Sequence, residues 1–566
     1  MLRRLLTAFL APVLLAGCAT TGAHPSTSAQ RGLVSAADAR AAEAGAEILR
    51  QGGSATDAAI ATMLALTVVE PQSSGIGGGG FYVWGDASGT VQTLDGRETA
   101  PIAAGPDWFL DEAGKPLPSS AVVLTGKSVG VPGNVSLAAK AHERHGKLAW
   151  AKLFEPAIRL ARDGFVVTER MREFLERSKN RAAADPAGRA LYYDAAGEPL
   201  PVGTLVRNEA LAQTLERIAR EGPDAFYKGA HAEALASTVW ARTPGARGMV
   251  AGDLAAYNAR ERPAECGAYR EYRICGMGPP SSGATTVYAV LKQLERFDLG
   301  ALGPQSATFW HLFAESQRLA YADRELYLAD PDFVQVPLAG LTDPAYLAAR
   351  SALIDPERTL QTVVAGIPPG VALARADGDE PEENGTSHFV TIDRDGNAVS
   401  YTSTIEGSFG SGIMIDGYYL NNELTDFSFT PEAGGRPVAN RVEGGKRPRS
   451  SMAPTLVYGS DGQLLMAVGA AGGSTIPAQV ARALIGMLDF HLSVTEAVAL
   501  PVLFAPSETV SVEEGTSLEA LVPQLEALGH TVTVRRMPIK TNAAQHTAAG
   551  WVGAADPRSE GGVGRE

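Results

Sequence analysis

A change of pattern just before Thr386 constrains the fold of this chain more than any other feature. Residues 359–384 are polar, acidic and rich in turn-forming residues, which is typical of a mobile linker. Two apolar strands follow at 389–392 and 398–404, on either side of a turn around Asp395-Gly396. We therefore expect a β-hairpin to begin close to Thr386, with slack in the chain on its N-terminal side.

Helical patterns dominate before the linker. A helix is expected at 35–53, capped by Ser35, and a second, mostly buried helix at 54–69. Further helices and strands are expected at 211–222, 232–241, 306–327, 418–421, 454–459, 464–470, 476–490 and 494–500. Strands layered between helices predict an α+β fold, a four-layer αββα sandwich in which the break before residue 386 lies inside one fold.

Length and charge narrow the class of protein. The chain has 566 residues, of which 45% are hydrophobic, so it can bury a large core. Its 49 Lys and Arg against 63 Asp and Glu give a net charge of −14. No basic run is interleaved with aromatic residues, which argues against a nucleic-acid partner.

The first residues have the pattern of a targeting segment. Residues 1–17 combine two arginines with an apolar stretch of about a dozen residues, too short for a membrane span, which needs about 20. The segment ends in Leu-Ala-Gly before Cys18, which resembles a bacterial lipoprotein signal. We expect Cys18 to be lipidated and residues 18–32 to form a flexible tether, placing the protein in the periplasm on a lipid anchor. A plain secretory signal is the alternative.

Two cysteines remain, Cys266 and Cys275, in the sequence CGAYREYRIC. In a hairpin with a two-residue turn at Arg270-Glu271 they face each other, at a separation close to what a disulfide needs. An exported protein meets oxidising conditions, which favour the bond. Two unpaired buried thiols are the alternative.

A glycine-rich stretch at 70–80 leads into a second hairpin, with strands at 81–84 and 91–95. No Lys-Ser or Lys-Thr follows and the next element is a strand, so this is not a phosphate loop. Arg97 comes after the hairpin. Its planar fork of donors suits a carboxylate ligand, and the alternative is a surface salt bridge.

Ten motifs, in order, resemble the γ-glutamyltranspeptidase family of N-terminal-nucleophile hydrolases from about residue 33 to the end. They are GGSATDAAIA (52–61), EPQSSGIGGGGFYVW (70–84), GRETAP (96–101), VGVPGNV (129–135), PPSSG (279–283), TSHF (386–389), NNELTDFS (421–428), KRPRSSMAPT (446–455), GAAGGS (469–474) and ADPR (555–558). The resemblance implies a chain that cuts itself between Gly385 and Thr386. Residues 33–385 would form a helix-rich large subunit and residues 386–566 a small subunit, paired as a heterodimer.

The chemistry explains why the cut is needed. A threonine hydroxyl is a weak nucleophile until a base takes its proton, and an α-amine with a pKa of about 7.7–8.0 can do so. An internal Thr386 has no free amine, so cleavage must precede activity. Gly385 suits a strained peptide because it has no side chain to clash. Taken alone, Asn-Gly-Thr is an ordinary turn.

The resemblance also implies roles for residues around Thr386. Thr404 would support the nucleophile, and Gly472 and Gly473 would donate backbone N–H groups to the oxyanion. The other implied contacts hold a zwitterionic γ-glutamyl group: Arg97, Ser450 and Ser451 on its carboxylate, Glu423 and Asp426 on its ammonium. Without the family, Ser450-Ser451 would be a loop and Asp426 a cap. No metal or other cofactor is expected, since no cluster has metal-ligand spacing.

Two departures bear on the substrate. Residue 406 is Glu where many members have Asn, so three carboxylates would surround one cation and at least one should be protonated or turned away. Residues 429–445 correspond to a lid in some relatives, and their sequence does not show whether they close.

The expected function is hydrolysis or transfer of γ-glutamyl groups from glutathione-like donors to water, amino acids or peptides. Glu406 supports an alternative, an acylase for glutaryl or cephalosporin-type groups. A lipid-anchored, non-catalytic binding protein is a third hypothesis.

Overall fold

Two β-sheets form the centre of the protein in this computed structural model, which describes residues 32–245, 247–371, 376 and 385–566. Residues 1–31, with the expected signal, Cys18 and most of the tether, lie outside the described part, as do 372–375 and 377–384 of the expected linker. No helix in the described part is long and apolar enough to cross a membrane.

The first sheet has seven strands in the order β22-β1-β9-β10-β2-β3-β6. Their bounds are Leu33–Ala36 (β1), Gly79–Gly85 (β2), Val91–Gly96 (β3), Arg260–Arg262 (β6), Ser387–Ile392 (β9), Ala398–Thr404 (β10) and Gly562–Arg565 (β22). The two strands that follow the expected cleavage point, β9 and β10, lie between β1 and β2 from the N-terminal half. This sheet is therefore built from both sides of that point.

The second sheet has six strands in the order β21-β20-β16-β15-β8-β7. Their bounds are Ala264–Tyr269 (β7), Tyr272–Met277 (β8), Thr455–Tyr458 (β15), Leu464–Ala471 (β16), Lys540–Thr547 (β20) and Gly550–Ala555 (β21). The two sheets pack face to face through β9, β10, β16 and β20. Across this interface the His388 ring lies over Gly469, where a Cβ would come within 2.6 Å of the ring.

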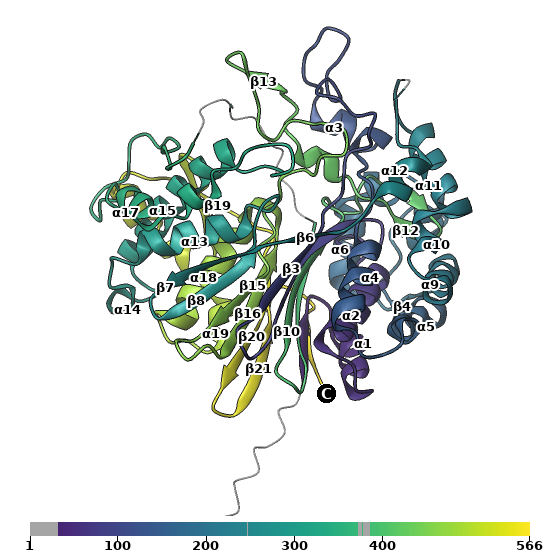
Figure 1. Cartoon of the computed structure of the whole chain (residues 1–566), viewed down its shortest axis with the longest axis horizontal. Helices are drawn as coiled ribbons and strands as arrows, with labels where there is room; N and C mark the ends of the chain where they lie inside the picture. The colour runs from purple at the N-terminus through teal and green to yellow at the C-terminus, as the bar shows by residue number, and fades with distance from the viewer. Residues whose placement is uncertain (1–31, 246, 372–375, 377–384) are drawn as a thin grey trace, which may run out of the picture.

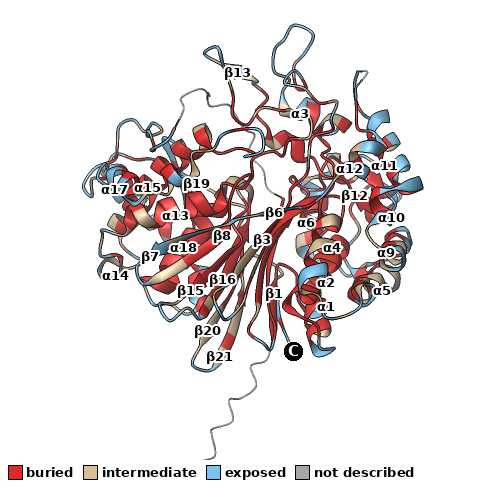
Figure 2. Ribbon diagram, viewed as in Figure 1, coloured by how far each residue is buried: buried red, intermediate tan, exposed pale blue. Residues whose placement is uncertain are grey.

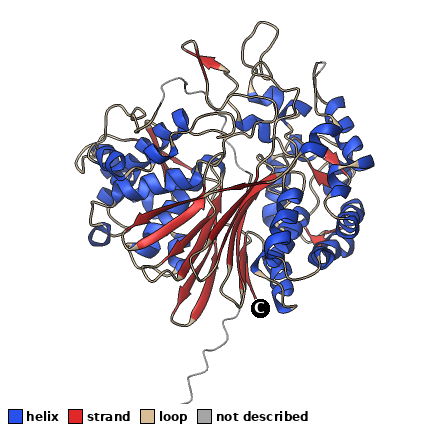
Figure 3. Cartoon of the chain, in the orientation of Figure 1, coloured by secondary structure: helices blue, strands red, loops and turns tan. Residues whose placement is uncertain are grey.

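Helices cover the outer face of each sheet, so the layers are helix, sheet, sheet, helix (Figures 1 and 3). On the first sheet lie α1 (Ala39–Arg50), α2 (Ala55–Val69) and α4 (Asn134–His145), with α5 (Glu155–Asp163) and α9 (Glu209–Glu221) outside them. On the second lie α13 (Gly283–Leu294), α18 (Ile476–Leu488) and α19 (Val494–Ala499), with α15 (Ala307–Tyr327) and α17 (Pro344–Ser351) packed against α13. The predicted αββα sandwich is confirmed.

The described chain has further α-helices and strands besides those named above. The helices are α3 (Ser119–Val122), α6 (Glu169–Arg177), α7 (Lys179–Ala182), α8 (Pro186–Tyr192), α10 (Asp224–Tyr227), α11 (Gly229–Ala241), α12 (Ala251–Ala256), α14 (Leu299–Leu302), α16 (Leu338–Leu341) and α20 (Val522–Ala527). The strands are β4 (Phe165–Val166), β5 (Leu205–Val206), β11 (Met414–Ile415), β12 (Tyr418–Tyr419), β13 (Glu432–Ala433), β14 (Arg436–Pro437), β17 (Leu503–Phe504), β18 (Thr509–Glu513) and β19 (Thr531–Arg535).

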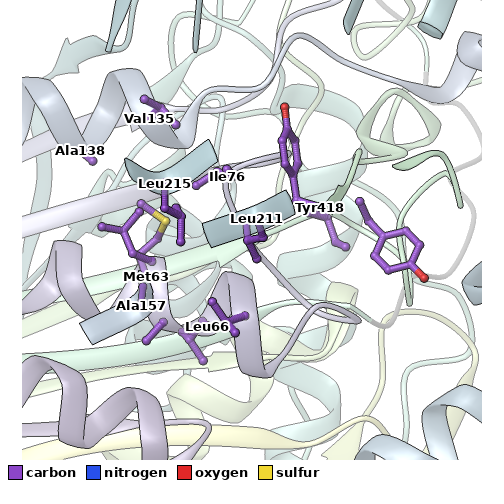
Figure 4. Packing of buried hydrophobic residues seen from close by; sticks show 14 of the residues in the cluster. Met63, Leu66, Ile76, Val135, Ala138, Ala157, Leu211, Leu215 and Tyr418 are labelled. Atoms are coloured by element: carbon purple, nitrogen blue, oxygen red, sulfur yellow. The ribbon is translucent and has the colours of Figure 1, made fainter. Parts of the chain in front are cut away.

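Apolar side chains fill the spaces between these layers, and the buried residues follow the sheets and the helix faces turned toward them (Figure 2). Helix α2 is buried along its whole length, as predicted. Met63 and Leu66 of this helix belong to the same core cluster as Leu211 and Leu215 of α9 (Figure 4). The core therefore holds both sheets, and the loops at their ends, in fixed positions.

Two local predictions have different outcomes. The helix expected at 35–53 begins only at Ala39, because Asp38 caps it and Ser35 lies in strand β1. The hairpin expected around Arg270-Glu271 is present, with Cys266 opposite Cys275 in β7 and β8. A disulfide joins these two cysteines.

Candidate active site

The register of the β9–β10 hairpin brings two threonines together. Ser387 pairs with Ser403, so the preceding residue, Thr386, lies opposite Thr404. Their hydroxyl oxygens are 3.3 Å apart, and both residues are buried. The nucleophile and its support, which the resemblance implied, are therefore adjacent because of a strand pairing.

The carbonyl of Gly385 lies between these hydroxyls. It accepts hydrogen bonds from the Thr386 hydroxyl and, at 3.0 Å, from that of Thr404. The Thr404 oxygen in turn accepts the Glu406 backbone N–H at 2.8 Å. A Cβ at Gly385 would lie 2.3 Å from the Glu406 carbonyl oxygen, so close backbone approach requires glycine here. Both donors draw electron density from the peptide carbonyl that would be cut.

A cavity opens beside Thr386. Its lining includes most of the residues predicted to act in the site, together with several that were not predicted. The lining residues are Arg97, Arg324, Gly385, Thr386, Thr404, Glu423, Asp426, Arg449, Ser450, Ser451, Met452, Gly473, Ser474 and Ile476. Glu406 and Gly472 are not among them.

One wall of the cavity is the turn between β16 and α18. Gly472 has φ 134° and Gly473 has φ 59°, both in the region that favours glycine. A Cβ at Gly472 would also come within 2.0 Å of the Pro538 carbonyl oxygen. Neither glycine N–H bonds to a backbone acceptor in the described part of the chain. Such free N–H groups at the start of a helix suit an anionic oxygen.

Arg97 is a buried ion-pair centre, and the surface salt-bridge interpretation is wrong: the residue is 1% exposed. Its guanidinium pairs with Glu423 and with Asp426, the two residues assigned to the substrate's ammonium. It also donates to the carbonyls of Pro448 at 3.2 Å and Arg449 at 2.8 Å. The predicted carboxylate-binding and ammonium-binding groups therefore bond to one another here.

Acidic side chains outnumber cations around Arg97. Glu98 is fully buried, and neither of its carboxyl oxygens has a hydrogen-bond partner in the described part of the chain. Burial raises the pKa of Glu98 to about 7, although the Arg97 charge opposes this shift. Burial likewise raises the pKa of Glu423 well above its usual range, with Glu98, Asp426 and Glu406 adding to the shift. The presence of Glu406 led us to expect one protonated carboxyl in this group. The raised pKa values make Glu98 and Glu423 the two candidates for it.

Glu406 itself lies to one side. It is buried, has φ 73°, and its carboxylate accepts the Thr425 hydroxyl at 3.4 Å. The negative charge of Glu406 nevertheless helps to raise the pKa of Glu423. Glu406 therefore influences the head-group end of the cavity without lining it.

A buried ion pair supports strand β9, which follows Thr386. The Lys540 ammonium contacts both Glu70 carboxylate oxygens, at 3.0 and 3.2 Å, and the hydroxyls of Ser73 and Ser387, each at 3.3 Å. Ser387 also donates to Glu70. The residue next to Thr386 is thereby tied to the glycine-rich segment and to β20.

Three buried side chains away from the cavity, His311, Glu315 and His530, have the composition of a metal site. The two histidines are joined by a 2.7 Å contact between Nδ1 of His311 and Nε2 of His530, and Glu315 pairs with Arg318 at 2.7 Å. The three side chains are thus already bonded to protein groups.

Sequence reasoning missed Glu98, Arg324 and Arg449 as neighbours of the cavity. Glu98 could have been identified from the sequence, since it follows Arg97 in the GRETAP motif. Arg324 lies within a predicted helix at 306–327, and nothing in a helical pattern marks which of its polar residues faces a site. Arg449 stands in the KRPRSSMAPT motif, where only the two serines were singled out.

Comparison with known sequences gives a consistent result. Residues 41–565 match the family model described as Gamma-glutamyltranspeptidase. The glutathione hydrolase proenzyme of Escherichia coli (strain K12) is 37% identical over 550 residues, which cover 95% of this chain and 92% of that protein. The acylase ACY 1 proenzyme of Pseudomonas sp. (strain SE83) is 36% identical over 511 residues, covering 89% and 88%.

Solved structures agree with the sequence matches. A cephalosporin acylase from Bacillus halodurans superposes with a TM-score of 0.83 at 25% identity, covering 97% of this chain and 99% of that chain. The gamma-glutamyltranspeptidase of Helicobacter pylori gives a TM-score of 0.54 at 35% identity, covering 57% of this chain and 91% of that chain.

Proposed function

The chain belongs to the gamma-glutamyltranspeptidase family, and we propose that it is a self-processing γ-glutamyl hydrolase and transferase acting on glutathione-like donors. The observation that carries the proposal is the contact between the Thr386 hydroxyl and the carbonyl of Gly385, beside a cavity with charged groups of both signs.

Self-processing follows from that contact. The Thr386 oxygen attacks the Gly385 carbonyl carbon, the C–N bond breaks, and the nitrogen takes up a proton to become a free α-amine. This leaves an ester between Gly385 and the Thr386 oxygen, which water hydrolyses to a Gly385 carboxylate and a Thr386 hydroxyl. The Thr404 hydroxyl, 3.0 Å from the Gly385 oxygen, stabilises charge on that oxygen during attack.

The mature site then uses the same hydroxyl on a substrate. The α-amine of Thr386 takes the hydroxyl proton, the oxygen attacks the γ-carbonyl of the donor, and the N–H groups of Gly472 and Gly473 stabilise the oxyanion. The proton passes to the leaving amine, and the γ-glutamyl ester on Thr386 is transferred to water or to the amine of an amino acid or peptide. Two half-reactions of this kind give ping-pong kinetics.

The charged end of the cavity accounts for the donor. A γ-glutamyl head group carries an ammonium and a carboxylate. Glu423 and Asp426 offer negative charge for the ammonium, while Arg97 and the hydroxyls of Ser450 and Ser451 offer donors for the carboxylate. Binding requires the head group to replace part of the ion pairing between Arg97 and the two carboxylates.

Processing is tested with Thr386→Ala. The wild-type protein should give two fragments on a denaturing gel, the smaller starting at Thr386 by intact mass, while Thr386→Ala stays one chain because no hydroxyl can attack. Thr386→Ser, which keeps the hydroxyl, is the matched control and should still cut. A cut Thr386→Ala protein would disprove the assigned nucleophile.

A second candidate is an acylase of the same fold that takes a glutaryl or cephalosporin-type acyl group. The acylase relatives and the effect of Glu406 on Glu423 favour it. A glutaryl group differs from γ-glutamyl in lacking the ammonium. The acid-rich cavity should therefore disfavour it, because buried carboxylates would gain no counter-charge.

A donor pair separates the two candidates. We expect kcat/KM for a γ-glutamyl anilide to exceed that for the glutaryl anilide by about 100-fold or more, since the ammonium has two carboxylates to bond, Glu423 and Asp426, and each charged hydrogen bond contributes about 1.5–3 kcal/mol. Asp426→Asn should reduce this ratio by about 10- to 100-fold. Faster turnover of the glutaryl anilide would establish the acylase instead.

A further inference from the structure

Ser450 and Ser451 both line the cavity, and both hydroxyls are acceptors in the structure. The Ser450 oxygen accepts the Met452 backbone N–H at 3.2 Å, and the Ser451 oxygen accepts Nη2 of Arg324 at 2.7 Å. A backbone N–H and a guanidinium can only donate, so neither uses the serine proton. In the described part of the chain neither serine hydroxyl donates to any acceptor. Both protons therefore remain available for a ligand.

Arg97 has little capacity left for a carboxylate. A guanidinium has five N–H donors, and four bonds are in use here, to Glu423, Asp426 and the carbonyls of Pro448 and Arg449. A two-point grip on a substrate carboxylate would require one of the ion pairs to break. The serine hydroxyls are thus the donors already present at this end of the cavity.

Arg324 reaches Ser451 from helix α15 and is held firmly. It is 4% exposed, its Nε donates to the Ser282 hydroxyl at 2.8 Å, and its guanidinium pairs with Glu325. Because its position is fixed by these contacts, the direction from which it approaches the Ser451 oxygen is fixed as well.

The PPSSG motif completes this support. Ser282 donates to the Ser450 carbonyl through both its N–H and its hydroxyl, each at 2.7 Å. The Ser450 N–H donates to the Pro280 carbonyl at 3.0 Å, and Ser281 donates to the carbonyl of Met452. The loop and α15 together clamp the segment that carries the two hydroxyls.

We infer that Arg324 is a positioning residue whose hydrogen bond to the Ser451 oxygen directs the Ser451 proton into the cavity, where it donates to the α-carboxylate of the donor. The inference rests on the proposed function, because it assumes a carboxylate-bearing acyl group. By occupying one lone pair, Arg324 excludes the orientation in which the hydroxyl would donate toward α15. Its positive charge also favours an anion on the other side of the oxygen.

The test compares two donors in the mature enzyme: a γ-glutamyl anilide and the 4-aminobutanoyl anilide, which lacks only the α-carboxylate. Arg324→Met should raise KM for the first by about 10- to 100-fold with little change in kcat, and leave KM for the second unchanged. Arg324→Lys keeps the charge and a donor, so it should restore most of the affinity. This variant also keeps the test decisive if Arg324→Met is not processed.

A double-mutant cycle checks that Arg324 acts through Ser451. If it does, adding Arg324→Met to Ser451→Ala should raise KM no further than Ser451→Ala alone. Arg296→Met is the matched control, because Arg296 is an arginine bonded to Ser351 and the Ile354 carbonyl away from the cavity, and neither donor should be affected.

The outcomes are distinct. Equal losses with both donors, or additive losses in the cycle, would overturn the positioning role. If the processed wild-type enzyme turns over neither donor, the proposed function is wrong. If the wild-type enzyme is active but the double-mutant cycle gives additive losses, only the positioning role of Arg324 is wrong.

Discussion

Glu265 shows at the residue scale how burial alone changes a titration. It stands in β7, next to the disulfide, with one carboxyl oxygen accepting the Thr285 hydroxyl at 2.8 Å and the other without a partner among the described residues. Burial raises the pKa of this carboxyl to about 7, because no cation compensates the charged form. Glu265 is therefore protonated in the folded protein under mildly acidic conditions.

The shift predicts a loss of stability with rising pH. The folded-state pKa of about 7 lies above the usual 4.5, so the folded protein binds more protons between these values and stability falls across this window. The loss is roughly 3 kcal/mol at most, from 1.36 kcal/mol per unit. Glu265→Gln should remove it, as measured by urea unfolding of wild type and variant at pH 5 and pH 8.

The raised pKa of Glu98 also makes the free energy of unfolding fall as the pH rises. This effect is present in both wild type and Glu265→Gln, so the difference between these two proteins reports on Glu265 alone. Glu271→Gln, on the exposed turn of the same hairpin, is the control and should leave the pH dependence intact. A Glu265→Gln protein that loses stability as steeply as wild type would show that the carboxyl is ionised throughout.

At the scale of elements, local patterns predicted local pairings and missed distant ones. The β9–β10 hairpin follows from two apolar runs around a turn, and its register places Thr386 opposite Thr404. Residues 33–36 form a strand only because β9 and β22 lie on either side, and those partners come from far along the chain. Ser35, a good helix cap by composition, is a strand residue for that reason.

The candidate active site likewise has parts that the sequence predicted and contacts that it did not. Family motifs identified residues that line the cavity, including Thr386, Asp426 and Ser451. They did not predict that Arg97 would be paired with the acidic residues assigned to the opposite charge of the substrate. Nor did they show Arg324, since its contact with Ser451 joins two elements 127 residues apart.

At the scale of the whole molecule, the two sides of the cleavage point are interleaved. Strands β9 and β10 lie within the first sheet between β1 and β2, and β15 of the second sheet pairs with β8. The apolar core spans both halves. Separating them would expose the interior of both sheets, which is as costly as unfolding.

We therefore expect the two processed fragments, one ending at Gly385 and one beginning at Thr386, to migrate together in gel filtration at nanomolar concentration and in high salt. The uncut Thr386→Ala chain should elute at the same volume. Separation should require a denaturant and coincide with loss of secondary structure in circular dichroism. Fragments that resolve in native buffer would show that contacts across the cut are weaker than the sheets indicate.

The edge of the first sheet has one more consequence. Strands β1 and β22 pair side by side, and the N–H of Glu566 donates to the carbonyl of Gly32 at 2.9 Å. A short link could therefore join residue 566 to residue 32 without disturbing the sheet. A circular permutant built in this way, opening at Thr386 and closing at Gly385, would have the nucleophile at its first position once the initiator methionine is removed. Such a protein would have a free α-amine on Thr386 without self-cleavage, because the order of its coding sequence would already place Thr386 at the N-terminus.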